Sequence, residues 1–503
     1  MGDEGLTLFL ADEAATERLG DDIAAALQPG DVVALHGDLG AGKTTLARAI
    51  LRSLAADPAL EVPSPTFTLV QTYEARLPAA HFDLYRLASP DELDELGFDE
   101  ALATGAVLVE WPERAGGRLP AAAIHVRLAE REAGRAVVIE APEPALSRLR
   151  RSLDIRRFLA AAGWGAARRQ FLLGDASSRA YETVTLPDAP PRILMNAPRR
   201  PDGPPIRDGR PYSRIAKLAE SVTPFVAVAR ALKGAGFAAP DIHAADLEAG
   251  LLMIEHLGTG DFLEAGAPVA GRYRAAAELL ADLHAVRWDA GMQAAPGVVH
   301  RVPGYDREAM AIETALLLDW YFPRARGRAA TDAERAFFAA AWDEMFDVLA
   351  GAERSLVLRD YHSPNLIWRA DRQGRDRLGI IDFQDAVIGP AAYDVASLAM
   401  DARVTISPEL EAGTVDAYCA ARAGQGGFDR AAFDRAYAIM AAQRNSKVLG
   451  IFVRLNDRDG KPHYLRHLPR IGDYLARALG HPALAPVRDV YRVLGISGDG
   501  ARA

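Results

Sequence analysis

Apolar and polar residues in the N-terminal part of the chain follow the periods of helices and strands in turn. Residues 12–28 carry apolar side chains at helical spacing, and Pro29-Gly30 ends this predicted helix. A strand is then expected to end near His36, and a second helix is expected to begin at Lys43 after a glycine-rich loop. Over residues 122–141, the segments AIHVRLAE and RAVVIEA alternate and predict a closing hairpin. This mixture of strands and helices indicates an α/β domain.

The pattern changes in the rest of the chain. Strands are predicted at RQFLLG, AYETVTL and RILMN, a helix over 223–235, and a further strand in LLMIEHLG. From near Gly258 onward helical spacing dominates, as in RYRAAAELLADLHAVRW. Within this helical part, residues 358–385 contain two short apolar strands, LIW and LGII, on either side of a turn rich in Arg, Asp, Gln and Gly, which predicts a hairpin. We expect a two-lobed α+β domain, with an N-lobe over about 152–257 and a C-lobe over about 258–503.

A proline pair and a basic helix, PEPALSRLRRSLDIRRFLAAAGW, separate the two regions. We place the boundary near residues 145–152, which gives domains 1–147 and 152–503. The helix carries five arginines, and a solvated basic face is the ordinary explanation for such a helix. Contact with tRNA is the alternative for these side chains, which are Arg148, Arg150, Arg151, Arg156 and Arg157.

Composition limits the class of protein. A chain of 503 residues exceeds the usual size of one hydrophobic core, so about two to four domains are expected. The single cysteine, Cys419, excludes an intramolecular disulfide and a cysteine-based zinc site. No apolar run approaches the roughly 18 residues of a membrane helix, and the start MGDEGLTLFL lacks the features of a signal peptide, so we expect a cytoplasmic protein without a membrane segment. The formal charge of -10 argues against a nucleic-acid coat over the whole surface.

Three polar side chains at the ends of the predicted hairpin form an ordered set. Asp360 and Asn365 precede its first strand in the spacing D-x-x-x-x-N, and Asp382 follows its second strand in a D-F pair. This is the phosphoryl-transfer arrangement of the protein-kinase-like fold, in which the first Asp accepts the proton of the acceptor hydroxyl while the Asn and the second Asp hold metal. Asp360 is therefore the candidate base, and Asn365 and Asp382 are candidate Mg²⁺ ligands. The competing interpretation is an ordinary hairpin with solvated acids.

The glycine-rich loop after the first strand matches G-x-x-x-x-G-K-T. Its glycines let backbone N–H groups approach phosphates, Lys43 reaches the outer phosphates, and the Thr44 hydroxyl ligates Mg²⁺. No guanine-reading N-K-x-D element occurs, so ATP is the expected nucleotide. A small-molecule kinase of this class would require an acceptor pocket that the short domain does not obviously supply. The expected nucleotide contacts are Gly37, Asp38, Gly40, Gly42, Lys43, Thr44 and Thr45.

Together with this loop, the segments SPTFTLVQTY, HFDLYRL and VEWPE resemble the TsaE family, the ATPase subunit of bacterial tRNA threonylcarbamoyladenosine synthesis, over about residues 6–140. The resemblance implies that Thr66 acts as a switch threonine and that Asp83 and Glu110 serve the metal or the attacking water. It also implies that Trp111 packs near the nucleotide or a partner. The implied partners are the paired subunits that transfer the threonylcarbamoyl group to tRNA, so that contact with tRNA itself would be indirect or weak. A nucleotide-binding scaffold without hydrolysis is the alternative.

The segments LRDYHSPN, IIDFQDA and GPAAYDVASL resemble the aminoglycoside phosphotransferase family over about residues 152–480. GDASSRAY, RILMNAP, PFVAVARAL and LLMIEHLG resemble one of its branches, the anomeric kinases of N-acetylmuramate and N-acetylglucosamine in cell-wall recycling. This branch implies a small sugar as acceptor, whereas other branches accept aminoglycosides or choline. A pseudokinase that only docks on or regulates the ATPase domain is a further alternative.

The kinase resemblance assigns further positions. Ser177, Ser178 and Arg179 would lie over the ATP phosphates, and the backbone from Glu255 to Leu257 would pair with adenine. Asp394 would support the catalytic loop through hydrogen bonds, while His284 is expected to be a core residue.

Two departures from the kinase pattern stand out. Leu358 replaces the usual histidine of the catalytic loop, where packing is expected to be the main requirement. No lysine occurs between Arg151 and Ala216, and Met195 lies near the place of the phosphate-anchoring lysine. Either Arg179 or Lys217 would supply the missing cation, or metal alone would neutralise the phosphates.

Overall fold

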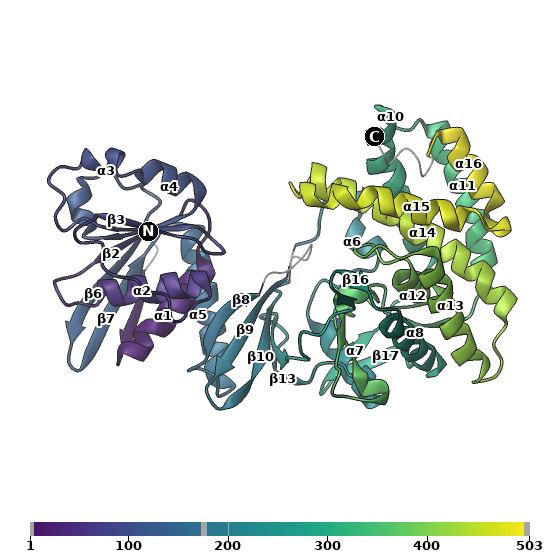
Figure 1. Cartoon of the computed structure of the whole chain (residues 1–503), viewed down its shortest axis with the longest axis horizontal. Coiled ribbons are helices and arrows are strands. Elements are labelled where there is room, and N and C mark those ends of the chain that lie inside the picture. Colours follow the sequence, from purple (N-terminus) through teal and green to yellow (C-terminus); the bar gives the residue numbers. More distant parts are fainter. Residues whose placement is uncertain (1–4, 173–178, 200, 497–503) are drawn as a thin grey trace. The chain divides into compact units, whose positions relative to one another are not determined.

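The computed structural model describes residues 5–172, 179–199 and 201–496 (Figure 1). Contacts divide the chain into two compact units. The first unit runs from the N-terminus to Asn196 and includes the short segments His243–Asp246 and Leu251–Ile254, and the second unit holds the remainder. Among the described helices, none has the length and apolar character needed to cross a lipid bilayer.

A seven-stranded mixed sheet forms the centre of the first unit. Its strand order is β1-β7-β6-β2-β5-β4-β3, with β2 parallel to both β5 and β6 and with β4 parallel to β5. Parallel strands place their carboxyl ends at one edge, where ligands bind in sheets of this kind. The strands are β1 (Leu6–Leu10), β2 (Val32–His36), β3 (Val70–Tyr73), β4 (Ala79–Asp83), β5 (Ala106–Glu110), β6 (Ile124–Arg131) and β7 (Gly134–Glu140).

Helices cover both faces of this sheet. Residues of α1, α2 and α5 share one apolar core with the sheet, and residues of α3 and α4 share the other (Figure 1). The structure confirms the helix predicted over 12–28, the strand ending at His36, the helix that begins at Lys43 and the closing hairpin of β6 and β7. The helices are α1 (Glu13–Ala26), α2 (Lys43–Ala55), α3 (Glu92–Glu95), α4 (Phe98–Thr104) and α5 (Ala145–Ala161).

A second sheet follows α5 in the chain, with strand order β13-β14-β10-β9-β8. Strands β8, β9 and β10 form an antiparallel meander, as the alternating segments predict. Its strands are β8 (Arg168–Leu172), β9 (Ala180–Leu186), β10 (Ala189–Asn196), β13 (Ile242–Asp246) and β14 (Leu251–Glu255).

Helix α5 runs without a break through the expected domain boundary at residues 145–152 and packs against α1. The expectation that its arginines form a solvated face is wrong for two of them. Arg148 pairs with Asp31 at 2.6 Å, and Arg156 pairs with Asp22 on α1 at 2.8 Å. Their partners lie more than a hundred residues away in the sequence, so a local pattern could not identify this face of the helix as a packing surface.

A buried ion network links α1, α5 and the second sheet. Arg169 on β8 donates two hydrogen bonds to Glu182 on β9, at 2.6 and 2.7 Å. The same guanidinium contacts Asp22 at 2.8 Å and the backbone oxygen of Ser152 at 2.9 Å. Charge on the two carboxylates raises the pKa of Arg169 although burial opposes this shift, so the arginine stays charged.

Replacing Arg169 with methionine should lower the free energy of unfolding of the full chain by about 3–5 kcal/mol, because Glu182 would remain buried without its cation. The measurement is urea unfolding followed by circular dichroism. Arg157→Met on α5 is the matched control, since the Arg157 side chain is 70% exposed and should change stability by less than about 0.5 kcal/mol. Equal stability of the two variants would show that the network does not hold the junction together.

The second unit is mainly helical, as its sequence pattern predicts. The predicted hairpin is present, with β20 (Leu366–Trp368) antiparallel to β21 (Leu378–Ile380), and β19 (Arg354–Val357) pairs with β22 (Val387–Pro390) nearby in the chain. The longest of the described helices, α14, packs against α9, α12 and α15. The helices that concern the site and its surroundings are α7 (Thr223–Gly234), α8 (Ala270–Ala285), α9 (Arg307–Leu316), α12 (Ala392–Ala399), α13 (Pro408–Ala423), α14 (Arg430–Asp457) and α15 (Leu468–Leu479).

Candidate functional site

The glycine-rich loop lies between β2 and α2, at the carboxyl end of the central strand of the first sheet. Gly37, Gly40 and Gly42 have φ angles of 142°, 86° and 101°, which side chains other than glycine rarely adopt. A Cβ on Gly37 would also lie 2.5 Å from the backbone oxygen of Leu128. The glycines are therefore required by the path of the loop, and they leave its backbone accessible to a ligand.

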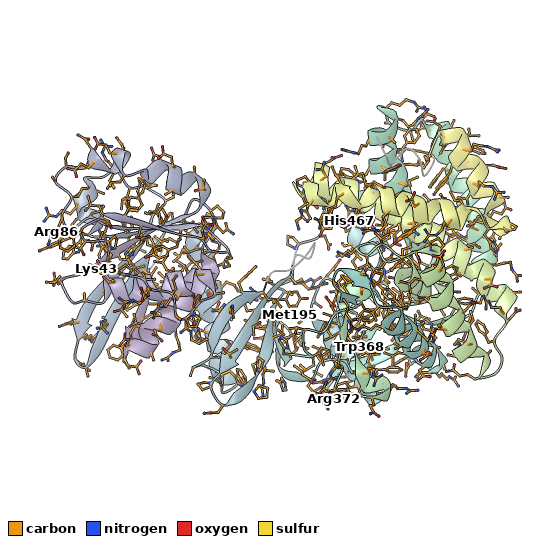
Figure 2. All side chains as sticks on the ribbon, viewed as in Figure 1. Lys43, Arg86, Met195, Trp368, Arg372 and His467 are labelled. Atoms are coloured by element: carbon orange, nitrogen blue, oxygen red, sulfur yellow. The ribbon has the colours of Figure 1, made fainter. Side chains whose placement is uncertain are left out.

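Lys43 begins α2 and turns back over this loop; it is labelled in Figure 2. Its Nζ donates to the backbone oxygens of Gly37 at 2.7 Å and Asp38 at 2.9 Å, and it lies 3.8 Å from the centre of the Trp111 ring. Burial lowers the pKa of Lys43, while the carboxylates of Glu110 and Glu113 act in the opposite direction. The lysine is thus held at the position where its charge would meet a phosphate.

Two buried acids end the neighbouring strands β4 and β5. Asp83 and Glu110 are directly opposite each other in the parallel register. Thr44 donates through Oγ1 to Glu110 Oε2 at 2.9 Å, and the ring of His81 is 3.0 Å from Glu110 Oε1. The structure therefore brings Thr44 and Glu110 together.

The SPTF segment lies against the other acid. Asp83 Oδ2 accepts hydrogen bonds from Ser64 at 2.6 Å and from Thr66 at 3.0 Å. The sequence reasoning identified Thr66 but missed Ser64 and His81. His81 precedes Asp83 by two residues on a strand, so the period of two could have placed both on one face.

The catalytic-loop set lies at the hairpin of the second unit. Asn365 donates through Nδ2 to the backbone oxygen of Asp360 at 2.9 Å and lies 3.4 Å from Asp382 Oδ2. Gln384, which the sequence reasoning did not single out, donates to Asp382 Oδ1 at 2.8 Å. Asp382 has a φ of 61°, a strained value for a residue with a side chain. The hairpin thus brings Asp360, Asn365 and Asp382 together.

The donor sets of both sites fit Mg²⁺. Because Asn365 uses its amide nitrogen to hold Asp360, its amide oxygen is left to join a carboxylate oxygen of Asp382 as a ligand. In the first unit, the Thr44 hydroxyl and the carboxylates of Asp83 and Glu110 are also oxygen donors. Over the described ranges, no group of three or more His, Cys, Asp or Glu residues is arranged to hold a metal ion. Mg²⁺ commonly binds through one or two carboxylates together with substrate phosphates.

Asp394 on α12 fixes the backbone of the catalytic loop. Its carboxylate accepts hydrogen bonds from the backbone N–H groups of Leu358 at 2.6 Å and Arg359 at 2.8 Å, and its side chain is fully buried. This confirms the supporting role expected for Asp394. Leu358, at the position where the kinase pattern has histidine, is 1% exposed, so its side chain satisfies the packing requirement expected there.

A buried charge cluster lies behind the catalytic loop. Arg359 forms an ion pair with Glu313 on α9, and Lys447 on α14 contacts the same carboxylate at 2.9 Å. Burial alone would raise the pKa of Asp360, but His362, Lys447 and Arg359 outweigh this effect and keep the pKa below its usual value. Asp360 is therefore ionised at neutral pH.

Five further positions were expected to bind phosphate or to stand at the place of the phosphate-anchoring lysine. Ser177 and Ser178 lie outside the described residues, and Arg179 directly precedes β9. Lys217 pairs with Asp306 at 3.1 Å, and Met195 is buried on β10 of the second sheet (Figure 2).

The expected adenine-pairing segment and the expected core histidine both lie in the second unit. The Glu255 N–H donates to the backbone oxygen of Asp241 at 2.9 Å, and Leu257 is buried. His284 is buried against the hydroxyl of Tyr418 at 2.9 Å, as expected for a core histidine.

Comparison with known proteins identifies two families in succession. A family model described as threonylcarbamoyl adenosine biosynthesis protein TsaE matches residues 10–137, and the phosphotransferase enzyme family matches residues 168–433. N-acetylmuramate/N-acetylglucosamine kinase of Caulobacter vibrioides is 38% identical over 352 residues, which cover 66% of this chain and 93% of that protein. The TsaE protein of Haemophilus influenzae is 42% identical over 132 residues, covering 25% of this chain and 82% of its own length.

A solved structure, the microcompartment-associated aminopropanol kinase, aligns with 69% of this chain and 99% of its own at 15% identity, with a TM-score of 0.42. The family assignment rests on the sequence matches, and both families use ATP. The chain belongs to the phosphotransferase enzyme family, and it carries a TsaE domain in front of its kinase domain.

Proposed function

We propose that the kinase domain transfers the γ-phosphoryl group of ATP to a hydroxyl of N-acetylmuramate or N-acetylglucosamine, at the anomeric position, as a step of cell-wall recycling. The observation that carries this proposal is the 38% identity to a kinase of that name over 93% of its length. The convergence of Asp360, Asn365 and Asp382 supports it, because these are the groups that phosphoryl transfer in this fold needs.

Asp360 is assigned the role of base. Its carboxylate is ionised and half-buried, so it can accept a hydrogen bond from the sugar hydroxyl and take its proton during attack on the phosphorus. Asn365 keeps the loop in place through its bond to the backbone of Asp360, while Asp394 holds the two residues before it. Mg²⁺, held by Asn365 and Asp382, would supply charge compensation for the phosphates.

For the TsaE domain we infer ATP hydrolysis that supports threonylcarbamoyladenosine formation in tRNA, together with the partner subunits that carry out the transfer. The support is the family match together with the contacts of the phosphate loop. Lys43 donates a hydrogen bond to the loop, and Thr44 donates one to Glu110. Asp83 and Glu110 would orient water or Mg²⁺, and Thr66 would respond to the nucleotide through Asp83. We assign both reactions to the cytoplasm, and we assign the two domains to residues 1–147 and 152–503.

A specific observation favours a second candidate for the kinase domain, which is a regulatory pseudokinase. Met195, a buried apolar side chain, lies near the place where the kinase pattern has a phosphate-anchoring lysine, and Lys217 is engaged with Asp306. The intact set of Asp360, Asn365 and Asp382 argues against this candidate, since a domain without catalysis has no need of it.

The deciding experiment offers MgATP to the full chain with a panel of acceptors: N-acetylmuramate, N-acetylglucosamine, other sugars, aminoglycosides and choline. Product mass and the position of the phosphate are then determined. We expect 1-phosphates of the two N-acetylated sugars as the best products. If an aminoglycoside or choline were the preferred acceptor, the proposed sugar substrate would be wrong. If no acceptor gave a product, the pseudokinase would be favoured.

A further inference from the structure

A strained turn of the catalytic loop lies directly before Asp360. The Asp360 N–H donates to the backbone oxygen of Leu358 at 2.9 Å, which closes a three-residue turn centred on Arg359. Arg359 has a φ of 69°, in the left-handed region that residues with side chains rarely adopt. A γ-turn of this hand is rare and strained, and such a conformation persists only where the surrounding structure holds it. The direction of the Asp360 carboxylate therefore depends on groups outside the turn.

Arg359 is held in this conformation at its backbone and at its side chain. Its N–H donates to Asp394 at 2.8 Å, which fixes the backbone that enters the turn. Its side chain points into the core and is 2% exposed. One terminal nitrogen of the guanidinium donates to the backbone oxygen of Ala216 at 2.8 Å, and the other donates to Glu313 on α9. The side chain thus ties the centre of the turn to a helix that comes 46 positions earlier in the chain.

The carboxylate of Glu313 is itself fixed in place. Its side chain is fully buried, and its Oε1 accepts from Lys447 at 2.9 Å as well as from Arg359. Its Oε2 accepts from Gln443 at 3.1 Å and from the hydroxyl of Tyr305. Four donors fill the roughly four acceptor positions of a carboxylate. The network therefore offers the guanidinium of Arg359 one position.

Stability alone does not require this ion pair, because apolar residues of similar volume often stabilise a core as well as a buried pair does. What the pair adds is a fixed orientation of the residue before the base. We propose that Glu313 is a positioning residue for phosphoryl transfer, which holds Arg359 and so sets the turn that directs the Asp360 carboxylate at the acceptor hydroxyl. This role rests on the proposed kinase function, and it is the same for whichever acceptor the kinase uses.

Glu313→Gln and Arg359→Gly should each lower kcat about 10- to 100-fold, because a misplacement of about 1 Å in a reacting group can cost 10²-fold. The KM for ATP and for the sugar should change by less than about two-fold, since Asp360 is assigned to proton transfer and not to binding. Glycine adopts a φ of 69° without strain, and Glu313 keeps Lys447 as its cation in this variant. Arg359→Gly therefore removes the anchor while the turn itself remains allowed.

The two variants change the charge near Asp360 in opposite directions. Glu313→Gln removes a negative charge, and Arg359→Gly removes a positive one. A purely electrostatic influence on the base would move kcat in opposite directions in the two variants. Loss of position lowers kcat in both, which is the result we expect.

A double-mutant cycle with Asp360→Asn tests whether Glu313 acts through the base. In the Asp360→Asn background, Glu313→Gln should lower kcat by less than about three-fold, because the group that it positions is already absent. A general structural defect would instead add its full loss to that of Asp360→Asn.

Glu411→Gln on α13 is the matched control. Glu411 also pairs with an arginine, Arg477 at 2.6 Å, and accepts a hydrogen bond from a tyrosine, Tyr437 at 3.0 Å. These partners lie on α15 and α14 and not in the catalytic loop. The same chemical change should therefore leave kcat within about two-fold of the wild-type value.

The melting temperature of each full-length variant is measured before its kinetics. If Glu313→Gln is unfolded at the assay temperature, Arg359→Gly provides the same test. Wild-type kcat in the folded variant, an equal loss in Glu411→Gln, or full additivity with Asp360→Asn would overturn the inference. A wild-type chain without activity on any acceptor would refute the proposed kinase function itself, and the positioning role with it.

Discussion

Asp360→Asn should lower kcat for sugar phosphorylation by about 10²–10⁴, which corresponds to roughly 3–5 kcal/mol of barrier. The substitution removes the group that accepts the hydroxyl proton and leaves the loop intact, because Asn365 bonds to the backbone oxygen of residue 360 and Asp394 to the two preceding N–H groups. The KM for ATP should change little, since Asp360 is not assigned to hold the nucleotide. Initial rates at saturating MgATP and sugar provide the measurement.

Asp371→Asn is the matched control for this prediction. Asp371 lies in the turn of the same hairpin with a 77% exposed side chain, so the same chemical change there should leave kcat within about two-fold. Full activity of Asp360→Asn would show that a different group accepts the proton. Equal loss in both variants would show that the hairpin tolerates neither substitution.

Lys43→Ala should abolish ATP-dependent support of tRNA threonylcarbamoylation while sugar phosphorylation continues at the wild-type rate. Removal of one positioned donor to a developing charge typically costs about 10²–10³ in rate, and Lys43 is the cation that the structure places over the phosphate loop. The substitution also removes the hydrogen bonds of Lys43 to the loop oxygens of Gly37 and Asp38, so the melting temperature of the variant is measured as a check that the chain is folded. A reconstituted tRNA-modification assay and the sugar kinase assay, run on the same preparation, measure the two effects.

Asp360→Asn and Lys43→Ala serve as controls for each other. Each should eliminate one activity and spare the other, because the phosphate loop and the catalytic hairpin belong to different units of the chain. Loss of both activities in either variant would contradict two separate sites.

Much of both sites was predictable because their signals are local. The phosphate loop requires glycines at fixed offsets between a strand and a helix, and the hairpin of 358–385 requires two apolar strands with Asp360, Asn365 and Asp382 at their ends. In each case a few neighbouring residues determine the backbone path, and the chemistry follows from that path.

The remaining features depend on contacts between residues distant in the sequence. Arg156 and Asp22 are separated by more than a hundred positions, so the sequence of α5 alone suggested a solvated face where the structure has a packed one. The same applies to Lys447 on α14, whose charge reaches Glu313 and the catalytic loop only through the packing of helices. His81 was missed because a histidine in an apolar strand is usually a core residue, and its role depends on the position of Glu110 on the next strand.

The central claim is that one chain contains two independent nucleotide sites, and the number of bound nucleotides tests it most directly. Calorimetric titration of the full chain with a non-hydrolysable ATP analogue and Mg²⁺ should give two sites per chain, and Lys43→Ala should leave one. A single site in the wild-type chain, or the loss of all binding in Lys43→Ala, would contradict the claim.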